Sequence, residues 1–195
     1  MLTLVLGGTR SGKSALAEQL AAQTAADLGA VVTYVAMAVV DPHDQDHVRR
    51  VAAHQARRPP SWATAECAQA DDLVDHLRGL DGVVLVDSLG SWLARHPDFE
   101  VVPTPLLSVL RARTRPTLLV SEEVGLAVHP PTALGRRYVD ALGVLNQRVA
   151  AIADRALLVV AGRTLELGPP SQRPPPSQRR PSGPPDPHTL GETGR

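Results

Sequence analysis

The sequence has little of several features on which common classes of protein depend. It contains a single cysteine, Cys67, so it has no internal disulfide, and a lone thiol is typical of a reducing compartment. Its 20 lysines and arginines balance 20 aspartates and glutamates, so it lacks the positive surplus with which proteins hold nucleic acids or anionic membranes. Its apolar runs are far shorter than the roughly 20 residues of a membrane-spanning helix. We therefore expect a cytoplasmic protein with no nucleic-acid partner and no membrane span.

Proline and lysine are distributed unevenly along the chain. Half of the 18 prolines lie from Pro169 onward, among serine, glutamine, arginine and glycine. Such a segment cannot bury enough apolar surface to offset the entropy lost on ordering. We predict a disordered proline-rich tail over residues 168–195 and a single domain over residues 1–167. Every basic residue except Lys13 is arginine, so the one lysine needs an explanation.

Short apolar runs alternate with helical patterns in the predicted domain. The runs that are typical of strands buried on both faces cover residues 2–6, 31–36, 83–86, 117–120 and 156–161. Helical spacing appears in residues 13–28, where Leu16, Leu20 and Leu28 share a face, and in residues 132–153. These patterns predict an α/β fold, with a mostly parallel sheet, helices on both faces and an edge hairpin that ends at residues 164–167.

One motif in the chain is specific enough to predict chemistry. Between the first strand and the first helix lies a G-x-x-x-x-G-K-[ST] phosphate loop, formed by Gly7, Gly8, Thr9, Arg10, Ser11, Gly12, Lys13 and Ser14. Glycines allow backbone N–H groups to surround a phosphate, and the helix N-terminus adds its positive dipole end. Lys13 would reach the outer phosphates and the Ser14 hydroxyl would bind Mg²⁺. The alternative, a chance glycine-rich turn, does not require this position before a helix.

Two acidic residues follow predicted strands. Asp87 ends the apolar run 83–86, as does the acidic residue that holds Mg²⁺ in phosphate-loop enzymes. Its alternative is to cap the helix that begins near Ser88, since aspartate is a favoured N-cap. Glu123 follows the run 117–120, and its alternative is a solvated carboxylate at a strand end.

A histidine-rich segment, residues 41–58, admits three interpretations. His43 and His47 lie four residues apart and could bind a metal together with Asp44 or Asp46. The segment could equally be a solvated polar helix face. In the third interpretation the neutral imidazole of His54 attacks the α-phosphorus of a nucleoside triphosphate, with nearby arginines neutralising the phosphates. The residues by themselves do not choose among these.

The motifs together resemble the bifunctional adenosylcobinamide kinase and adenosylcobinamide-phosphate guanylyltransferase family of cobalamin biosynthesis. The family's opening Gly-Gly-x-Arg-Ser-Gly-Lys-Ser is met by residues 7–14, and its block around the guanylylated histidine by Asp46, Arg50, Val51 and His54. Residues 85–89 and 120–125 are similar to its two later strand ends, except that Glu122 stands where the family usually has asparagine. The resemblance runs from the N-terminus to about residue 167.

The resemblance implies a phosphate-loop NTPase fold and two reactions on the corrinoid. The enzyme would phosphorylate adenosylcobinamide and then transfer GMP from GTP, through guanylylated His54, to give adenosylcobinamide-GDP; ATP is possible in the kinase step. Lys13 and His54 would be catalytic, and Mg²⁺ would lie on Ser14 and Asp87. Further nucleotide contacts are implied at Ala36, Met37, Ala38, Gln55, Ala56, Arg57, Arg58, Glu66 and Asp87. Relatives form trimers, so a homo-oligomer is expected.

Two other classes of function fit the phosphate loop. A different phosphate-loop small-molecule kinase would use Lys13 and Asp87 but give His54 no role. A non-catalytic nucleotide-binding module would bind nucleotide without turnover and recruit a partner through the proline-rich tail.

Overall fold

A computed structural model describes residues 1–37, 55–67, 72–126 and 128–169, together with the isolated positions Gln45, Arg49, Ala52 and Gln69. The elements, in chain order, are β1 Leu2–Gly7, α1 Lys13–Leu28, β2 Val32–Ala36, β3 Ala63–Glu66, α3 Asp72–Gly79, β4 Val83–Asp87, α4 Leu89–Leu93, the 3₁₀ helix η1 Pro97–Phe99, α5 Thr104–Ala112, β5 Thr117–Glu122, α6 Ala133–Ala150, β6 Arg155–Val160 and β7 Arg163–Leu167.

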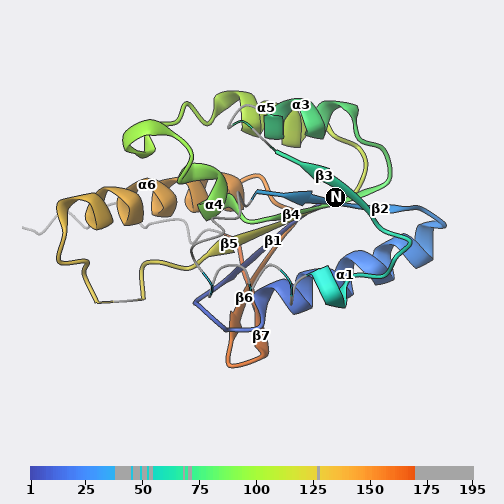
Figure 1. Cartoon of the computed structure of the whole chain (residues 1–195), viewed down its shortest axis with the longest axis horizontal. Helices are drawn as coiled ribbons and strands as arrows, with labels where there is room; N and C mark the ends of the chain where they lie inside the picture. Colours follow the sequence, from blue (N-terminus) through green and yellow to red (C-terminus); the bar gives the residue numbers. More distant parts are fainter. Residues whose placement is uncertain are drawn as a thin grey trace, which may run out of the picture.

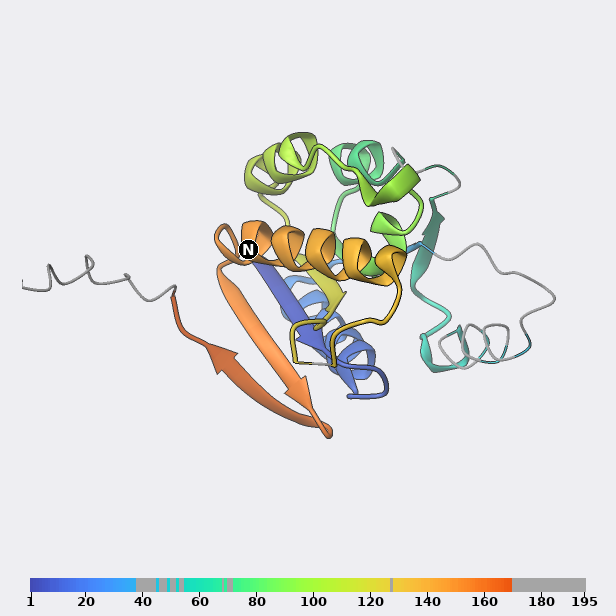
Figure 2. The ribbon, with the colours of Figure 1, turned by 90° about the vertical axis from the view of Figure 1, so that its left-hand side faces the viewer.

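The described strands form one seven-stranded sheet in the order β3-β2-β4-β5-β1-β6-β7. Strands β1 to β6 run parallel, and only β7 runs antiparallel, to β6. Helices α3, α4, α5 and α6 cover one face, and α1 covers the other (Figures 1 and 2). The structure thus confirms the predicted α/β fold class and the edge hairpin after Gly162.

Helix α1 packs on the sheet through a face made mostly of small residues. Its buried residues are Ala17, Glu18, Ala21 and Ala25, whereas Leu28 is exposed. Of the leucines that share the predicted face, Leu16 and Leu20 pack, partly buried, against the core, and Leu28 does not. Three alanines allow the helix backbone to lie close to the sheet, because they project only a methyl group toward it.

The carboxyl ends of five neighbouring strands meet at one edge of the sheet. Ala36 pairs with Glu66 on one side and with Asp87 on the other, and Gly7 pairs with Glu122. Ligands of parallel α/β sheets bind at this edge. The fold therefore brings residues from β3, β2, β4, β5 and β1 into one row.

At the other end of the sheet, where the parallel strands begin, the Arg113 side chain links the end of α3 to the start of β5. Its guanidinium donates to the backbone carbonyls of Leu77 at 3.1 Å and Gly82 at 3.0 Å, and to Leu80. It also donates to Thr117 Oγ1 at 2.9 Å. One side chain thus satisfies three carbonyls where α3 ends.

We expect Arg113→Met to lower the free energy of unfolding by about 3 kcal/mol, because removing the donor leaves partly buried carbonyls without a partner. Urea unfolding followed by circular dichroism measures the change. Arg111→Met, on an exposed position of α5, is the matched control and should change stability little. Equal unfolding midpoints for the two variants would contradict the role given to Arg113.

Candidate active site

The phosphate loop joins β1 to α1 in a conformation that depends on glycine. Gly12 precedes the helix with φ 98°, in the left-handed region that side chains other than glycine rarely adopt. A Cβ on Gly7 would collide with Ser11 Oγ and lie 2.8 Å from the Val159 carbonyl oxygen. The loop is also held by the Gly162 N–H, which donates to the Ser11 carbonyl at 2.8 Å. The sequence pattern and the observed turn therefore agree.

The N-terminus of α1 is suited to an anion. The N-cap residue Gly12 has no side chain, the Lys13 N–H donates to the neutral Ser11 hydroxyl at 3.3 Å, and the first turn contains no acidic residue. The helix dipole and the N–H groups of the first turn therefore face the loop without a negative side chain of that turn.

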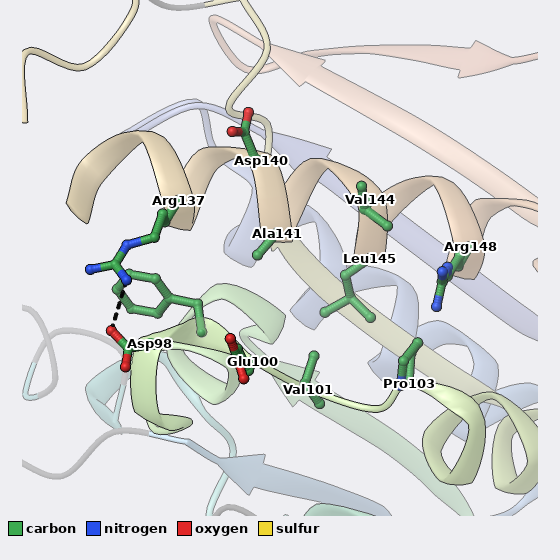
Figure 3. A pocket seen from close by; sticks show the side chains of 11 residues that line it. Asp98, Glu100, Val101, Pro103, Arg137, Asp140, Ala141, Val144, Leu145 and Arg148 are labelled. Carbon is green, nitrogen blue, oxygen red and sulfur yellow. Dashed lines mark ion pairs between the residues drawn. The ribbon is translucent and has the colours of Figure 1, made fainter. Parts of the chain in front are cut away.

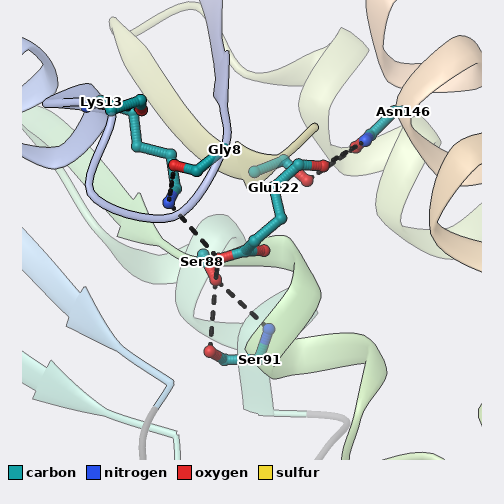
Figure 4. Close-up of polar contacts among 8 residues, drawn as sticks. Gly8, Lys13, Ser88, Ser91, Glu122 and Asn146 are labelled. Atoms are coloured by element: carbon teal, nitrogen blue, oxygen red, sulfur yellow. Dashed lines mark hydrogen bonds and ion pairs between the residues drawn. The ribbon is translucent and has the colours of Figure 1, made fainter. Parts of the chain in front are cut away.

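Lys13 folds back over this loop. Its ammonium lies 3.4 Å from the Gly8 carbonyl oxygen and 4.0 Å from Glu122 Oε1, and its side chain is 13% exposed (Figure 4). The only lysine of the chain therefore stands over the loop, beside the end of β5.

Glu122 is held in place on three sides. Its Oε1 accepts a hydrogen bond from Ser88 Oγ at 2.8 Å, and its backbone carbonyl accepts one from Asn146 Nδ2 at 2.9 Å. Asn146 is itself fixed by the buried Ser121 hydroxyl, which donates to Asn146 Oδ1 at 2.7 Å. Gly90 closes the third side, since a Cβ there would collide with Glu122 Oε2.

The Tyr138 side chain of α6 lies beside Gly90 and near Glu122. A Cβ on Gly90 would lie 2.5 Å from its hydroxyl as well. Burial, and then the negative charge of Glu122, raise the pKa of Tyr138 to about 12. The hydroxyl is therefore neutral at physiological pH and able to donate a hydrogen bond.

Asp87, at the end of β4, hydrogen-bonds to Tyr34 of β2. Burial, and then the Asp87 carboxylate, raise the pKa of the Tyr34 hydroxyl, which therefore stays protonated and acts as the donor. The neighbouring Ser88 caps α4, because the Ser91 N–H donates to Ser88 Oγ at 3.3 Å. The alternative interpretation, that Asp87 is the cap, is thus wrong, and its carboxylate lies at the sheet edge.

Two arginines connect residues 55–58 to helix α1 and strand β2. Arg57 donates to both carboxylate oxygens of Glu18 on α1, at 3.0 and 3.1 Å. The guanidinium carbon of Arg58 lies 3.4 Å from the centroid of the Tyr34 ring. Together these contacts bring residues 55–58 next to α1 and, through Tyr34, next to Asp87.

The other residues expected to bind nucleotide differ in their exposure, and some lie outside the described residues. Gly8, Thr9 and Arg10 are exposed in the loop, and Gln55 and Ala56 are exposed and helical. Glu66 is exposed at the end of β3, in line with Asp87. Met37 is buried in the core, so its backbone is the part available for contact. His54 and Ala38 lie outside the described residues, as do His43, His47, Asp44 and Asp46.

The Glu123 carboxylate makes local hydrogen bonds in the turn after β5. Its carboxylate accepts hydrogen bonds from the N–H groups of Gly125 at 2.9 Å and Leu126 at 3.0 Å. It therefore holds the turn that follows β5. Within the described part of the chain, no group of three or more histidine, cysteine, aspartate or glutamate residues has the arrangement of a metal site.

A separate groove runs between α6 and the chain that follows η1 (Figure 3). Its volume is about 420 Å³, and Arg137 pairs with Asp98 across one end at 3.0 Å. None of the nucleotide-binding residues expected from the sequence lines it. Its Phe99 packs edge-on against Tyr138, with ring centroids 5.2 Å apart.

Comparison with known proteins places the chain in a family. Residues 3–167 match the family model described as cobinamide kinase / cobinamide phosphate guanyltransferase. The chain belongs to this family. It is 40% identical to the bifunctional adenosylcobalamin biosynthesis protein CobP of Pseudomonas aeruginosa, over 86% of this chain and 97% of that protein. It is 32% identical to the protein CobU of Salmonella typhimurium, over 83% of this chain and 97% of that protein.

Family membership confirms the resemblance found in the sequence, and with it a kinase and guanylyltransferase function in cobalamin biosynthesis. A solved KaiC-like protein from Pyrococcus horikoshii shares 17% identity over 80% of this chain and 69% of its own, with a TM-score of 0.48. So distant a likeness adds nothing about function. Helices long and apolar enough to cross a bilayer are absent from the described residues.

Sequence reasoning missed several residues that shape this corner. Tyr34, Glu18 and Ser88 contact Arg58, Arg57 and Glu122, and the sequence patterns assigned none of the three a role. Their roles depend on which strands become neighbours. A polar residue at the end of a buried strand was the one available signal, and it fits Ser88, which directly follows β4.

Proposed function

We propose that the corner formed by the phosphate loop, Asp87 and residues 54–58 carries out both reactions of the family. The observation that supports this most directly is the position of Lys13. The chain's only lysine lies over the loop, and Asp87 ends a strand at the same sheet edge.

In the kinase step, the triphosphate would lie along residues 7–14. The N–H groups at the start of α1 and the Lys13 ammonium would hold the β- and γ-phosphates. The acceptor hydroxyl of adenosylcobinamide then forms a bond to the γ-phosphorus as the bond to the bridging oxygen breaks; the nucleoside diphosphate leaves and the hydroxyl proton is released to solvent.

Mg²⁺ fits the oxygen donors of this corner. Ser14 supplies a hydroxyl in the first turn of α1, and Asp87 supplies a carboxylate at the end of β4. A magnesium ion held by one or two side chains and by substrate phosphates needs no larger protein cluster. When bound, the ion would neutralise charge on the phosphates.

In the guanylyl transfer, we assign the nucleophile to His54. Its imidazole nitrogen would form a bond to the α-phosphorus of GTP while the bond to the α,β-bridging oxygen breaks and pyrophosphate leaves. The phosphate of adenosylcobinamide phosphate then takes the GMP and frees the histidine. Arg57 and Arg58, just after His54, would stabilise the phosphate charge. Hydrogen bonds to Glu18 hold the Arg57 guanidinium in place.

Incubation with Mg²⁺ and GTP labelled on either the α- or the γ-phosphate tests this assignment. We expect acid-labile, base-stable label on the protein from the α-position only, and release of that label by adenosylcobinamide phosphate. Nucleotide binding without α-label would contradict the transferase half and leave another phosphate-loop kinase. Binding with no turnover of any kind would leave a nucleotide-binding module.

Three further proposals concern the cellular location, the oligomeric state and the tail over residues 168–195. The buried single thiol of Cys67 agrees with a cytoplasmic location. A homo-oligomer, a trimer by resemblance, and a disordered tail over residues 168–195 remain predictions. Size-exclusion chromatography with light scattering, and NMR of the full chain, would measure them.

A further inference from the structure

Lys13 and Glu122 form an ion pair across the mouth of the phosphate loop. The ammonium and Glu122 Oε1 are 4.0 Å apart, with the two side chains 13% and 30% exposed. Partial burial makes such a pair stronger than one at the surface, because water screens it less. The charge that would bind phosphate is therefore balanced by a carboxylate from β5.

The carboxylate is fixed in this position. Ser88 donates to Oε1, Asn146 holds the backbone carbonyl, and Gly90 leaves space for Oε2 that a side chain would fill. Glu122 Oε2 is buried and has no hydrogen-bond partner among the described residues. A charge held this firmly beside the loop cannot move far when an anion arrives.

We propose that Glu122 is a built-in counter-anion for Lys13, and that it makes the phosphate loop discriminate against nucleotides without a bound divalent cation. This inference rests on nucleotide binding at the loop, as proposed above. A metal-free diphosphate competes with Glu122 for Lys13 and is repelled by it. A cation on the phosphates removes most of that repulsion, so the metal complex binds with little penalty.

Glu122→Gln tests the inference because it keeps the shape and an acceptor for Ser88 but removes the charge. We expect the variant to bind metal-free GDP roughly tenfold more tightly than the parent chain, and GDP with Mg²⁺ no more than about threefold more tightly. Isothermal titration calorimetry with EDTA or with Mg²⁺ measures both dissociation constants. The preference for the metal complex should thus shrink.

Two further variants separate the outcomes. Glu166→Gln, on the outer strand β7, removes the same charge from a pair with Arg155 and should leave both affinities unchanged. Glu122→Asp keeps the charge and should keep most of the metal preference. Thermal unfolding of each variant shows whether it is folded.

Equal affinities for the parent chain and Glu122→Gln would overturn the inference while leaving the proposed function intact. A kinase kcat that falls in Glu122→Gln, with nucleotide affinity unchanged, would also overturn it and assign the carboxylate to proton transfer. If the parent chain bound no nucleotide at all, the proposed function itself would fail.

Discussion

Alanine in place of His54 is expected to abolish guanylyl transfer while the kinase step continues. Loss of a covalent nucleophile typically lowers kcat by about 10⁶-fold, because the two-step route through the enzyme intermediate is no longer open. In the proposed kinase step Lys13 and the loop hold the phosphates, and no imidazole takes part. Formation of adenosylcobinamide phosphate and of adenosylcobinamide-GDP, separated by chromatography, measures the two reactions independently.

The protein label supplies the control for this prediction. In the parent chain, α-labelled GTP should leave label on the protein, and His54→Ala should leave none. If His54→Ala kept the α-label, another residue would be the nucleophile. If it lost both reactions while remaining folded, the two activities would share the histidine, which the assignment made above does not allow.

Lys13→Ala is expected to impair both reactions. The Lys13 ammonium lies over the phosphate loop, 3.4 Å from the Gly8 carbonyl oxygen. Removing a charged donor aimed at a transferred group typically lowers kcat by roughly 10²–10³-fold. Both γ-transfer and the departure of pyrophosphate develop charge on the outer phosphates, so both rates should fall.

Steady-state kinetics of the two half-reactions, with nucleotide binding by calorimetry, measure this effect. Arg78→Ala is a suitable control, since Arg78 is exposed on α3 and pairs only locally with Asp75, at 2.7 Å. It should behave like the parent chain. A Lys13→Ala variant with full activity in either reaction would show that this reaction does not use the phosphate loop.

The fold was predictable where the sequence pattern is local. Continuous apolar runs identified β1, β2, β4, β5 and β6, because strands covered on both faces need apolar side chains throughout. Strand β3 was not found, since its sequence Ala-Thr-Ala-Glu is mostly exposed at the sheet edge and carries no such pattern. In α1 the leucine spacing marked Leu16 and Leu20, which pack against the core, but it did not mark the buried alanines, because alanine gives a weak hydrophobic signal.

The parts of the site that a local sequence pattern encodes were predictable, and the contacts between residues distant in the sequence were not. The phosphate loop is one contiguous motif whose geometry follows from its glycines, and Asp87 directly follows a buried run. The bond of Arg57 to Glu18 spans 39 residues, and that of Ser88 to Glu122 spans 34. Such pairs depend on the order of the strands, which no local pattern determines. His54 stays a prediction from the family motif.

The position of β1 has a consequence for the order in which the nucleotide site can form during synthesis. The loop residues leave the ribosome before β5 and β6, yet β1 lies between these two strands in the sheet. The backbone group that holds Ser11 belongs to Gly162, in the turn before the last strand of the domain. The nascent chain therefore carries its phosphate loop without its supporting strands until the β6–β7 hairpin has been made, so the loop is translated well before it can be completed.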